Sequence, residues 1–264
     1  MDLPVTLVGV KWLPIAAVAL PFVDIVEVPG WAIEGLLPGA YQLLHNLDLD
    51  FSLTAHNVLD DAWLGRCRQA IARTGSPWFS LHLGFSSELV RFDEHMLPES
   101  AVLDRATCLE RLIDAIRFAK QNLDVPILVE NLDYCPEGAY EHVCEPRFIA
   151  EVVESTGCAL LLDLAHLQVS AAWLGLEPRA YASRLPLDRV IEVHLSSPRQ
   201  LDMRLDDGHY ELIERDFLLL EWVLQRTNPE AIVLEYRRDE RLLLKQLRRL
   251  LPLRDRQTAA DEPE

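Results

Sequence analysis

Short apolar segments alternate with longer amphipathic segments along most of the chain. The apolar segments are rich in Val, Ile and Leu, a composition typical of strands that are covered on both faces in a parallel sheet. They lie at 6–12, 23–28, 50–56, 78–84, 126–131, 158–163, 190–195 and 231–236. We therefore expect eight strands, most of them buried.

The segments between these strands have helical periodicity. In 105–121 the residues Leu109, Leu112, Ile113 and Ile116 form one apolar stripe with charged residues opposite. Similar patterns occur at 59–73, 147–156, 211–226 and 240–250. Eight strands with seven or eight helical crossovers predict an α/β fold, a (β/α)₈ TIM barrel.

The barrel is expected to form a single domain over residues 1–253. A chain of 264 residues, half of them apolar, is long enough to bury one core of that size. The last segment, 254–264, is rich in charged and polar residues and is predicted to be a disordered tail.

The net charge limits the classes of partner. The chain has 25 basic and 42 acidic residues, a net charge of −17. Such a surface disfavours nucleic acid or an anionic membrane as the main partner, because those contacts depend on Lys and Arg. It also provides many carboxylates that could bind cations.

The cysteines and the N-terminal segment bear on the location of the protein. Five cysteines, with no C-x-x-C pair, favour reduced thiols in a cytoplasmic protein over a disulfide framework. The apolar segment 3–26 is interrupted by Lys11, Asp24 and three prolines. We therefore expect neither a signal peptide nor a membrane span.

Seven successive predicted strands carry a carboxylate or an imidazole near their C-terminal ends. These residues are Glu27, His56, His82, Glu130, Asp163, His194 and Glu235. The C-terminal ends of barrel strands converge on the face where barrel enzymes build their active sites. Burying so many ionisable groups together costs several kcal/mol per ion without a counter-charge, on the order of magnitude, and a bound cation removes that cost.

Two short spacings add further candidate ligands. Asp163 and His166 form a D-x-x-H motif just after the sixth predicted strand, and Asp207 and His209 form a D-x-H motif after the seventh. Asp206 is an alternative to Asp207. The predicted metal ligands are His56, His82, Glu130, Asp163, His166, His194, Asp207, His209 and Glu235. Nine oxygen and nitrogen ligands without a thiolate suit two or three ions of iron, manganese or zinc, and leave Glu27 without a role.

The order of these ligands resembles that of xylose-isomerase-like barrels with a three-metal site. Two families share this order. One is the zinc-dependent apurinic endonucleases, and the other is the multinuclear non-haem iron-dependent oxidative enzymes that include the methanobactin-biosynthesis oxidase.

Several motifs between residues 23 and 251 favour the iron family. "WFSLHLGFS" resembles its SEHL segment, "MLPES" its LLP turn, "EVHLSS" its EIHLAG segment and "IVLEYRRDE" its closing LIEWD. "LLLDLAHLQVSA" resembles its LLLDxxNxxVxA segment. "LVENLDY" matches its ENxxY motif through Glu130, Asn131 and Tyr134.

The resemblance implies how the ligands divide and what the enzyme does. The implied sets are His56, His82 and Glu130; Glu130, Asp163, His194 and Glu235; and His166, Asp207 and His209. The family uses two or three iron ions and O₂ to oxidise cysteine residues of a ribosomally made precursor peptide, often with a separate peptide-binding partner protein. Asn131 and Tyr134 would stand beside the ligands or face the substrate.

Three other functions fit the same residues. The first is a zinc or manganese phosphodiesterase of the apurinic endonuclease type, which the negative charge disfavours. The second is a sugar isomerase or epimerase with Glu130 and Glu235 as its acid–base pair. The third is a barrel without catalysis that serves as a binding partner.

Overall fold

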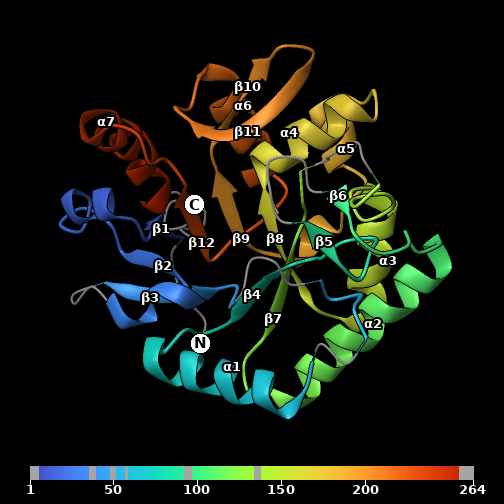
Figure 1. The fold of residues 1–264 in the computed structure, drawn as a ribbon. Coiled ribbons are helices and arrows are strands. Elements are labelled where there is room, and N and C mark those ends of the chain that lie inside the picture. The colour runs from blue at the N-terminus through green and yellow to red at the C-terminus, as the bar shows by residue number, and fades with distance from the viewer. Residues whose placement is uncertain are drawn as a thin grey trace, which may run out of the picture.

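A closed barrel of eight parallel strands forms the centre of the molecule (Figure 1). The computed structural model describes residues 6–35, 40–47, 52–56, 59–91, 97–133 and 138–255. The strands follow one another around the barrel in the order β1-β12-β9-β8-β7-β4-β3-β2. Their bounds are Leu7–Lys11 (β1), Ile25–Pro29 (β2), Tyr41–His45 (β3), Phe79–His82 (β4), Ile127–Glu130 (β7), Ala159–Asp163 (β8), Val190–Leu195 (β9) and Ala231–Leu234 (β12). The predicted (β/α)₈ barrel is confirmed.

Seven of the predicted strands overlap barrel strands, but the third prediction is wrong. The third strand is Tyr41–His45, not 50–56. Its first residue, Tyr41, is exposed and only its last three residues are buried, so its apolar run is too short to stand out. In the predicted segment, the described residues 52–56 form a turn instead.

Side-chain hydrogen bonds explain why residues 52–56 leave the strand conformation. The Thr54 hydroxyl donates to the carbonyl of Phe85 at 2.8 Å, and the Ser52 hydroxyl donates to the carbonyl of Ser87 at 2.8 Å. These bonds join residues more than 30 positions apart and take the place of strand pairing. The segment is therefore held against the loop that follows β4.

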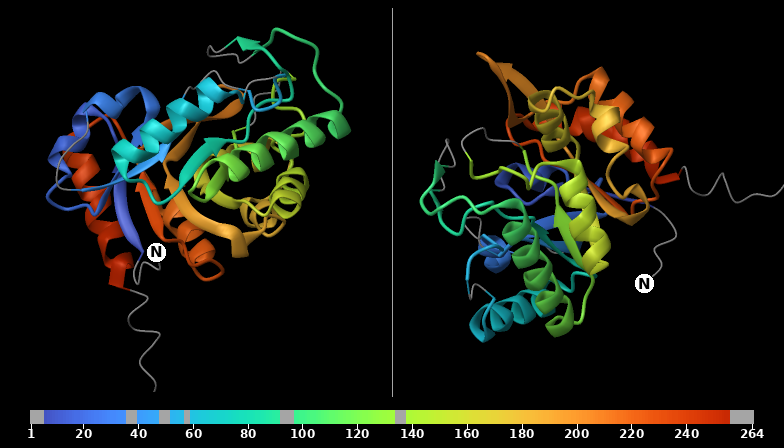
Figure 2. Two further views of the ribbon diagram at one scale, coloured as in Figure 1. Left: turned by 90° about the horizontal axis from the view of Figure 1, so that it is seen from below. Right: turned by 90° about the vertical axis from the view of Figure 1, so that its right-hand side faces the viewer.

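The five predicted helices are present and pack outside the barrel (Figure 2). They are α1 (Asp61–Thr74), α2 (Arg105–Asn122), α3 (Pro146–Thr156), α6 (Glu214–Leu224) and α7 (Glu240–Leu250). The Asp60 side chain caps α1 by accepting from the Trp63 amide, and α1 ends at Gly75 in the left-handed conformation. Four of them, α1, α2, α3 and α6, connect consecutive barrel strands, as parallel pairing requires, and α7 follows the last strand, β12.

Two further α-helices have no amphipathic signature in the sequence. They are α4 (Leu164–Trp173) and α5 (Pro178–Ala182). Eight of the ten residues of α4 are buried, so it has no polar face that would create a stripe. Short 3-10 helices complete the chain at Pro14–Val18, Gly30–Gly35, Leu187–Arg189 and Leu251–Asp255.

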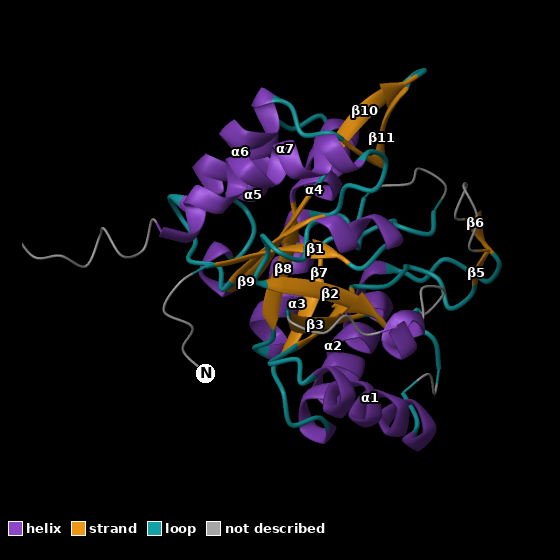
Figure 3. Cartoon of the chain, turned by 90° about the vertical axis from the view of Figure 1, so that its left-hand side faces the viewer, coloured by secondary structure: helices purple, strands orange, loops and turns teal. Residues whose placement is uncertain are grey.

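Two small antiparallel hairpins extend beyond the barrel strands on one side (Figure 3). One pairs β5 (Val90–Arg91) with β6 (Leu97–Pro98), and the other pairs β10 (Ser197–Leu201) with β11 (Arg204–Tyr210). The second hairpin packs on α4. It belongs to the loop after β9, at the end of the barrel where the predicted ligands lie.

The remaining predictions about the chain are tested only in part. The four described cysteines, Cys67, Cys108, Cys144 and Cys158, are buried thiols outside any disulfide. Within the described ranges no helix has the length and apolar character needed to cross a membrane. Of the predicted tail, residues 256–264 lie outside the described residues, and residues 254–255 end the last 3-10 helix.

Candidate metal centre

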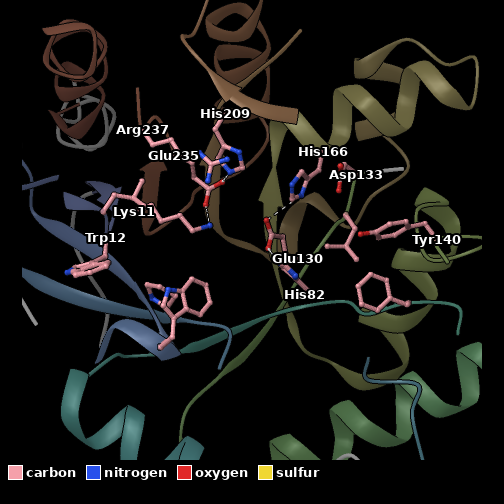
Figure 4. Close-up of a pocket in the computed structure, with 15 residues that line it drawn as sticks. Lys11, Trp12, His82, Glu130, Asp133, Tyr140, His166, His209, Glu235 and Arg237 are labelled. Carbon is pink, nitrogen blue, oxygen red and sulfur yellow. Dashed lines mark hydrogen bonds and ion pairs between the residues drawn. The ribbon is translucent and has the colours of Figure 1, made fainter. Parts of the chain in front are cut away.

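The parallel register of the barrel brings the predicted ligands side by side at the C-terminal ends of the strands. His82 is opposite Glu130 in the β4–β7 pair, and Asp163 is opposite His194 in the β8–β9 pair. Glu235 follows directly after β12. Figure 4 shows several of these side chains around one cavity.

Glu130 is the centre of this group and is almost completely buried. Its Oε2 lies 3.2 Å from Nε2 of His82 and 3.2 Å from Nε2 of His45. Its Oε1 lies 3.4 Å from Nδ1 of His166 and 3.5 Å from Nδ1 of His194. The two oxygens thus face different histidines, which is the arrangement of a carboxylate that could bridge two ions.

The structure places His45, not His56, in this group. His56 is 70% exposed and lies outside the barrel, where its Nε2 is 2.9 Å from an Arg111 nitrogen. His45 ends β3, the strand that the sequence assigned to the wrong segment, and its Nδ1 lies 2.9 Å from the Ser80 hydroxyl. The neighbouring Asn46 also supports the group, because its side chain accepts from the His82 amide at 2.8 Å.

The start of α4 positions both residues of the D-x-x-H motif, Asp163 and His166. Oδ1 of Asp163 caps the helix by accepting from the His166 amide at 2.7 Å, and Oδ2 is left without a hydrogen-bond partner. Asn131 fixes this corner, since its side chain bonds both the amide and the carbonyl of Asp163, at 2.9 and 3.0 Å. The carbonyl of Asn131 lies 2.9 Å from Nδ1 of His166. His166 therefore turns its Nε2 toward the mouth of the barrel, the end at which the C-terminal ends of the strands meet.

Asn131 and Tyr134 are the two residues predicted to stand beside the ligands. Asn131 is fully buried, and its side chain bonds backbone groups of Asp163. Tyr134 lies outside the described residues.

The D-x-H motif lies on the β10–β11 hairpin. Oδ2 of Asp207 is 3.3 Å from Nε2 of His166, and Oδ1 accepts from the Ser196 hydroxyl at 2.8 Å. Nε2 of His209 is 3.0 Å from Oε2 of Glu235. His209 has a φ of 52°, in the left-handed region that few non-glycine residues adopt. Asp206, the alternative candidate, is paired across the hairpin with Arg199.

A second layer of buried carboxylates lies deeper in the barrel, and the sequence prediction left it without a role. Glu27 and Glu192 are fully buried, and both face Nε2 of His194, at 2.6 and 3.5 Å. Trp78 donates its indole N–H to Glu192 at 2.8 Å. Glu192 and His194 are two positions apart in β9, so both side chains point to the same side of the strand, and this spacing was the available signal.

Lys11 is another member that the sequence analysis missed. Its ammonium group contacts Glu235 and lies 3.9 Å from Glu27. Burial disfavours the charged form of Lys11, but the neighbouring carboxylates, Glu235 first, outweigh burial and raise its pKa above the ordinary lysine value. Among the described residues it is the one Lys or Arg paired with the carboxylates of the mouth.

Several buried atoms of this group have no hydrogen-bond partner among the described residues, and four ligand sets are close enough to hold a metal ion. The atoms are both carboxylate oxygens of Glu27, Oε2 of Glu130, Oδ2 of Asp163, Oε1 of Glu192, both ring nitrogens of His194 and Nδ1 of His209. The sets are His45, His82 and Glu130; Glu130, Asp163 and His166; Asp163, His194 and Glu235; and Glu27, Glu192 and His194. Buried polar atoms are normally satisfied, so this concentration indicates a site for cations. The residues fit a metal centre.

The pKa shifts of these residues also indicate a site for cations. Burial raises the pKa of Asp163 to about 7. Burial disfavours the charged form of His166, but Asp163 and its other acidic neighbours raise the pKa of His166 well above the ordinary value. Burial lowers the pKa of His82, which keeps that imidazole in the neutral form that binds metal. Without a metal ion, protons must provide much of the positive charge that the acids require.

The mouth opens into a cavity of 260 Å³. Its floor consists of candidate ligands and Lys11, and its walls are largely apolar (Figure 4). The wall residues include Trp12, Trp31, Phe85, Leu132 and Tyr140, together with Asp133 and Arg237. The cavity can therefore admit a small, partly apolar group to the candidate ligands.

Comparison with known proteins identifies the family. A family model described as "RiPP precursor modification enzyme MbnB/TglH/ChrH" matches residues 33–251. The chain belongs to this family. A UPF0276 protein of Bordetella pertussis is 37% identical over 190 residues, covering 70% of this chain and 65% of that protein. A UPF0276 protein of Caulobacter vibrioides is 29% identical over 230 residues, covering 81% of this chain and 79% of that protein.

Solved structures support the fold. A D-tagatose 3-epimerase-like protein superposes with a TM-score of 0.66 at 15% identity, covering 97% of this chain and 100% of the other. Endonuclease IV from Thermus thermophilus superposes with a TM-score of 0.59 at 19% identity, covering 94% and 98% of the two chains. A xylose isomerase domain containing protein from Salmonella typhimurium has a TM-score of 0.61 at 14% identity, covering 94% and 97%. At these identities the likeness shows a shared xylose-isomerase-like TIM barrel and nothing about the reaction.

Proposed function

We propose that this protein is an iron-dependent oxidative enzyme that modifies cysteine residues of a ribosomally made precursor peptide, with O₂ as co-substrate. One observation carries the proposal: imidazoles and carboxylates with unsatisfied buried atoms line the floor of one cavity, in a chain that belongs to a peptide-modifying family. A separate peptide-binding partner protein is expected.

Nine residues would hold two or three ions. The proposed division is the one that the resemblance to the iron family implies, with Glu130 shared between the first two sets. The distances support the first set and the Asp163, His194 and Glu235 part of the second, and they also join His166 to Glu130 and Asp163. The sets are His45, His82 and Glu130; Glu130, Asp163, His194 and Glu235; and His166, Asp207 and His209. Compared with the ligand set predicted from sequence, this proposal replaces His56 by His45 and keeps the other eight residues.

Bound iron would supply the one-electron chemistry that amino-acid side chains lack. The protein's own residues would bind and orient the peptide. The apolar wall of the cavity, with Trp12 on one side and Tyr140 on the other, would pack against the peptide and exclude water. Asp133 lines the cavity without belonging to a ligand set, and burial raises its pKa, so its carboxylate is suited to accept the thiol proton of the cysteine.

The experiment that tests this proposal starts with protein purified without oxygen. Its iron, zinc and manganese contents are measured, and iron(II)-loaded protein is then mixed with cysteine-containing peptides in air. We expect iron in the purified protein, O₂ consumption that depends on the peptide, and a mass change at cysteine. The His45→Ala variant, expected to lack these activities, is the control.

The alternatives give different outcomes in the same experiment. Zinc in place of iron, with cleavage of abasic-site DNA, would support a phosphodiesterase. Turnover of ketoses with manganese would support an epimerase. Either result without peptide oxidation would overturn the proposal.

A further inference from the structure

Glu27 is the one strand-end acid that the proposed ligand sets do not use. It lies on β2 with its side chain fully buried, and neither of its carboxylate oxygens receives a well-aligned hydrogen bond from the described residues. A buried carboxylate costs several kcal/mol, at order of magnitude, unless neighbouring groups compensate its charge, so its position requires an explanation. The nearest group is the imidazole of His194, which is also fully buried.

The two nitrogens of His194 have different surroundings. Nδ1 lies 3.4 Å from Oε1 of Glu235 and 3.5 Å from Oε1 of Glu130. Nε2, on the opposite side of the ring, lies 2.6 Å from Oε2 of Glu27. Two ligands of a tetrahedral ion with bonds of about 2.0–2.1 Å stand about 3.3 Å apart. The Nδ1 side therefore has the spacing of metal ligands, and the Nε2 side has the spacing of a hydrogen bond.

We propose that Glu27 is a positioning residue for His194: its carboxylate accepts the Nε2 proton and thereby presents the Nδ1 lone pair to the metal centre. This inference rests on the proposed metal centre. A neutral imidazole carries one proton, and only the other nitrogen can bind metal. An acceptor beneath the ring fixes that choice and the orientation of the ring.

Glu192 provides a second acceptor that is itself held in place. Its Oε1 lies 3.5 Å from Nε2 of His194, and its Oε2 accepts the indole N–H of Trp78 at 2.8 Å. The longer distance makes it the weaker partner. Glu27 is therefore expected to matter more than Glu192.

The geometry disfavours an additional cation held by Glu27, Glu192 and His194, although their atoms lie close enough together for one. The separation of 2.6 Å between Glu27 and His194 is well below the spacing of about 3.3 Å that a tetrahedral ion imposes. A proton between these two atoms satisfies both of them. The deeper layer therefore supports the metal centre from below.

Cobalt(II) titration of metal-free protein, followed by visible absorption, tests this role. Glu27→Leu removes the acceptor and is expected to weaken cobalt binding by about 10- to 100-fold. Glu27→Gln keeps an acceptor oxygen and is expected to stay within a few-fold of wild type. Glu192→Gln should have a smaller effect than Glu27→Leu. Glu88→Leu, a matched change outside the barrel, should have none.

A second measurement does not depend on any variant. In zinc-loaded wild-type protein, the ¹⁵N shifts of His194 are expected to show a proton on Nε2 and zinc on Nδ1. Zinc on Nε2 would overturn the proposal, and so would equal cobalt affinity of Glu27→Leu and wild type. If Glu27→Gln loses as much affinity as Glu27→Leu, the charge of Glu27 or direct ligation matters, and the positioning role is wrong. If wild type binds neither metal, the proposed function fails as well.

Discussion

Two histidine–glutamate pairs in this protein use the same chemistry in opposite surroundings. Nε2 of His56 lies 3.7 Å from Glu88 on the surface, and Nε2 of His45 lies 3.2 Å from Glu130 in the barrel mouth. Arg111 completes the surface pair by donating to both partners. Among the described residues, no arginine bonds to the pair in the mouth. Side chains and solvent can balance the charge of a surface pair, whereas the buried pair requires protons or metal ions to balance the charge of its carboxylate.

The largest difference between the two pairs is expected from neutralising their carboxylates. Glu130→Gln should lower metal affinity by more than about 100-fold and abolish peptide oxidation, because two ligand sets share Glu130. Glu88→Gln should change neither. Metal content and O₂ consumption of the two variants are the measurements. Normal metal content in Glu130→Gln would contradict the shared role.

Replacing the two histidines compares the same pairs from the other side. His45→Ala should reduce metal affinity by about 10- to 100-fold, less than Glu130→Gln, because His45 contributes to one set only. His56→Ala should bind metal as wild type does. Isothermal titration with zinc measures both. A loss in His56→Ala equal to that in His45→Ala would restore His56 as a ligand.

Lowering the pH should weaken metal binding in the mouth, whereas the surface pair is expected to have no part in this effect. Asp163 has a pKa of about 7 without metal, so it must release a proton when an ion binds below that pH. Through Asp163 alone, metal affinity should therefore fall by about fivefold from pH 7 to pH 6, and by about tenfold per unit at lower pH, where one full proton is released per ion. The raised pKa of His166 acts in the same direction. Affinity that stays constant over this range would exclude both effects.

The smallest effect is expected at the hairpin, whose ligands are less deeply buried than Glu130. Ser196→Ala removes the hydroxyl that donates to Asp207 and should weaken metal binding by at most about tenfold. Ser183→Ala removes an exposed hydroxyl that donates to the Ala180 carbonyl at the end of α5, and it serves as the control. Metal stoichiometry by emission spectroscopy compares them. A loss of all ions in Ser196→Ala would mean that the sets are not separable.

The parts of this fold that follow from local rules were predictable from sequence. Fully buried strands such as Ile127–Glu130 are continuous apolar runs, and the acids at their ends mark the mouth. The strand Tyr41–His45 was missed because its first residue is exposed, and with it His45 was missed. The β10–β11 hairpin has little apolar alternation, since its second strand is only half-buried.

Other parts depend on contacts between distant segments. Lys11 stands at the end of an apolar strand, and its pairing with Glu235, 224 positions away, has no local signature. Whether His45 or His56 faces Glu130 is decided by which segment forms the third strand, and both segments end in a histidine. Residue types therefore predicted which kinds of side chain the site contains better than they predicted which individual residues contribute them.

The ligands stand on two kinds of support. Glu130 and His194 belong to strands of a closed barrel, which has no free edge, whereas Asp207 and His209 stand on a two-stranded hairpin attached to its rim. Mutations that shorten or reshape the hairpin are expected to leave the hydrogen bonding of the barrel intact. In the proposed centre, the number of ions is thus the property expected to diverge most easily during evolution, while the scaffold and the two deeper sets stay the same.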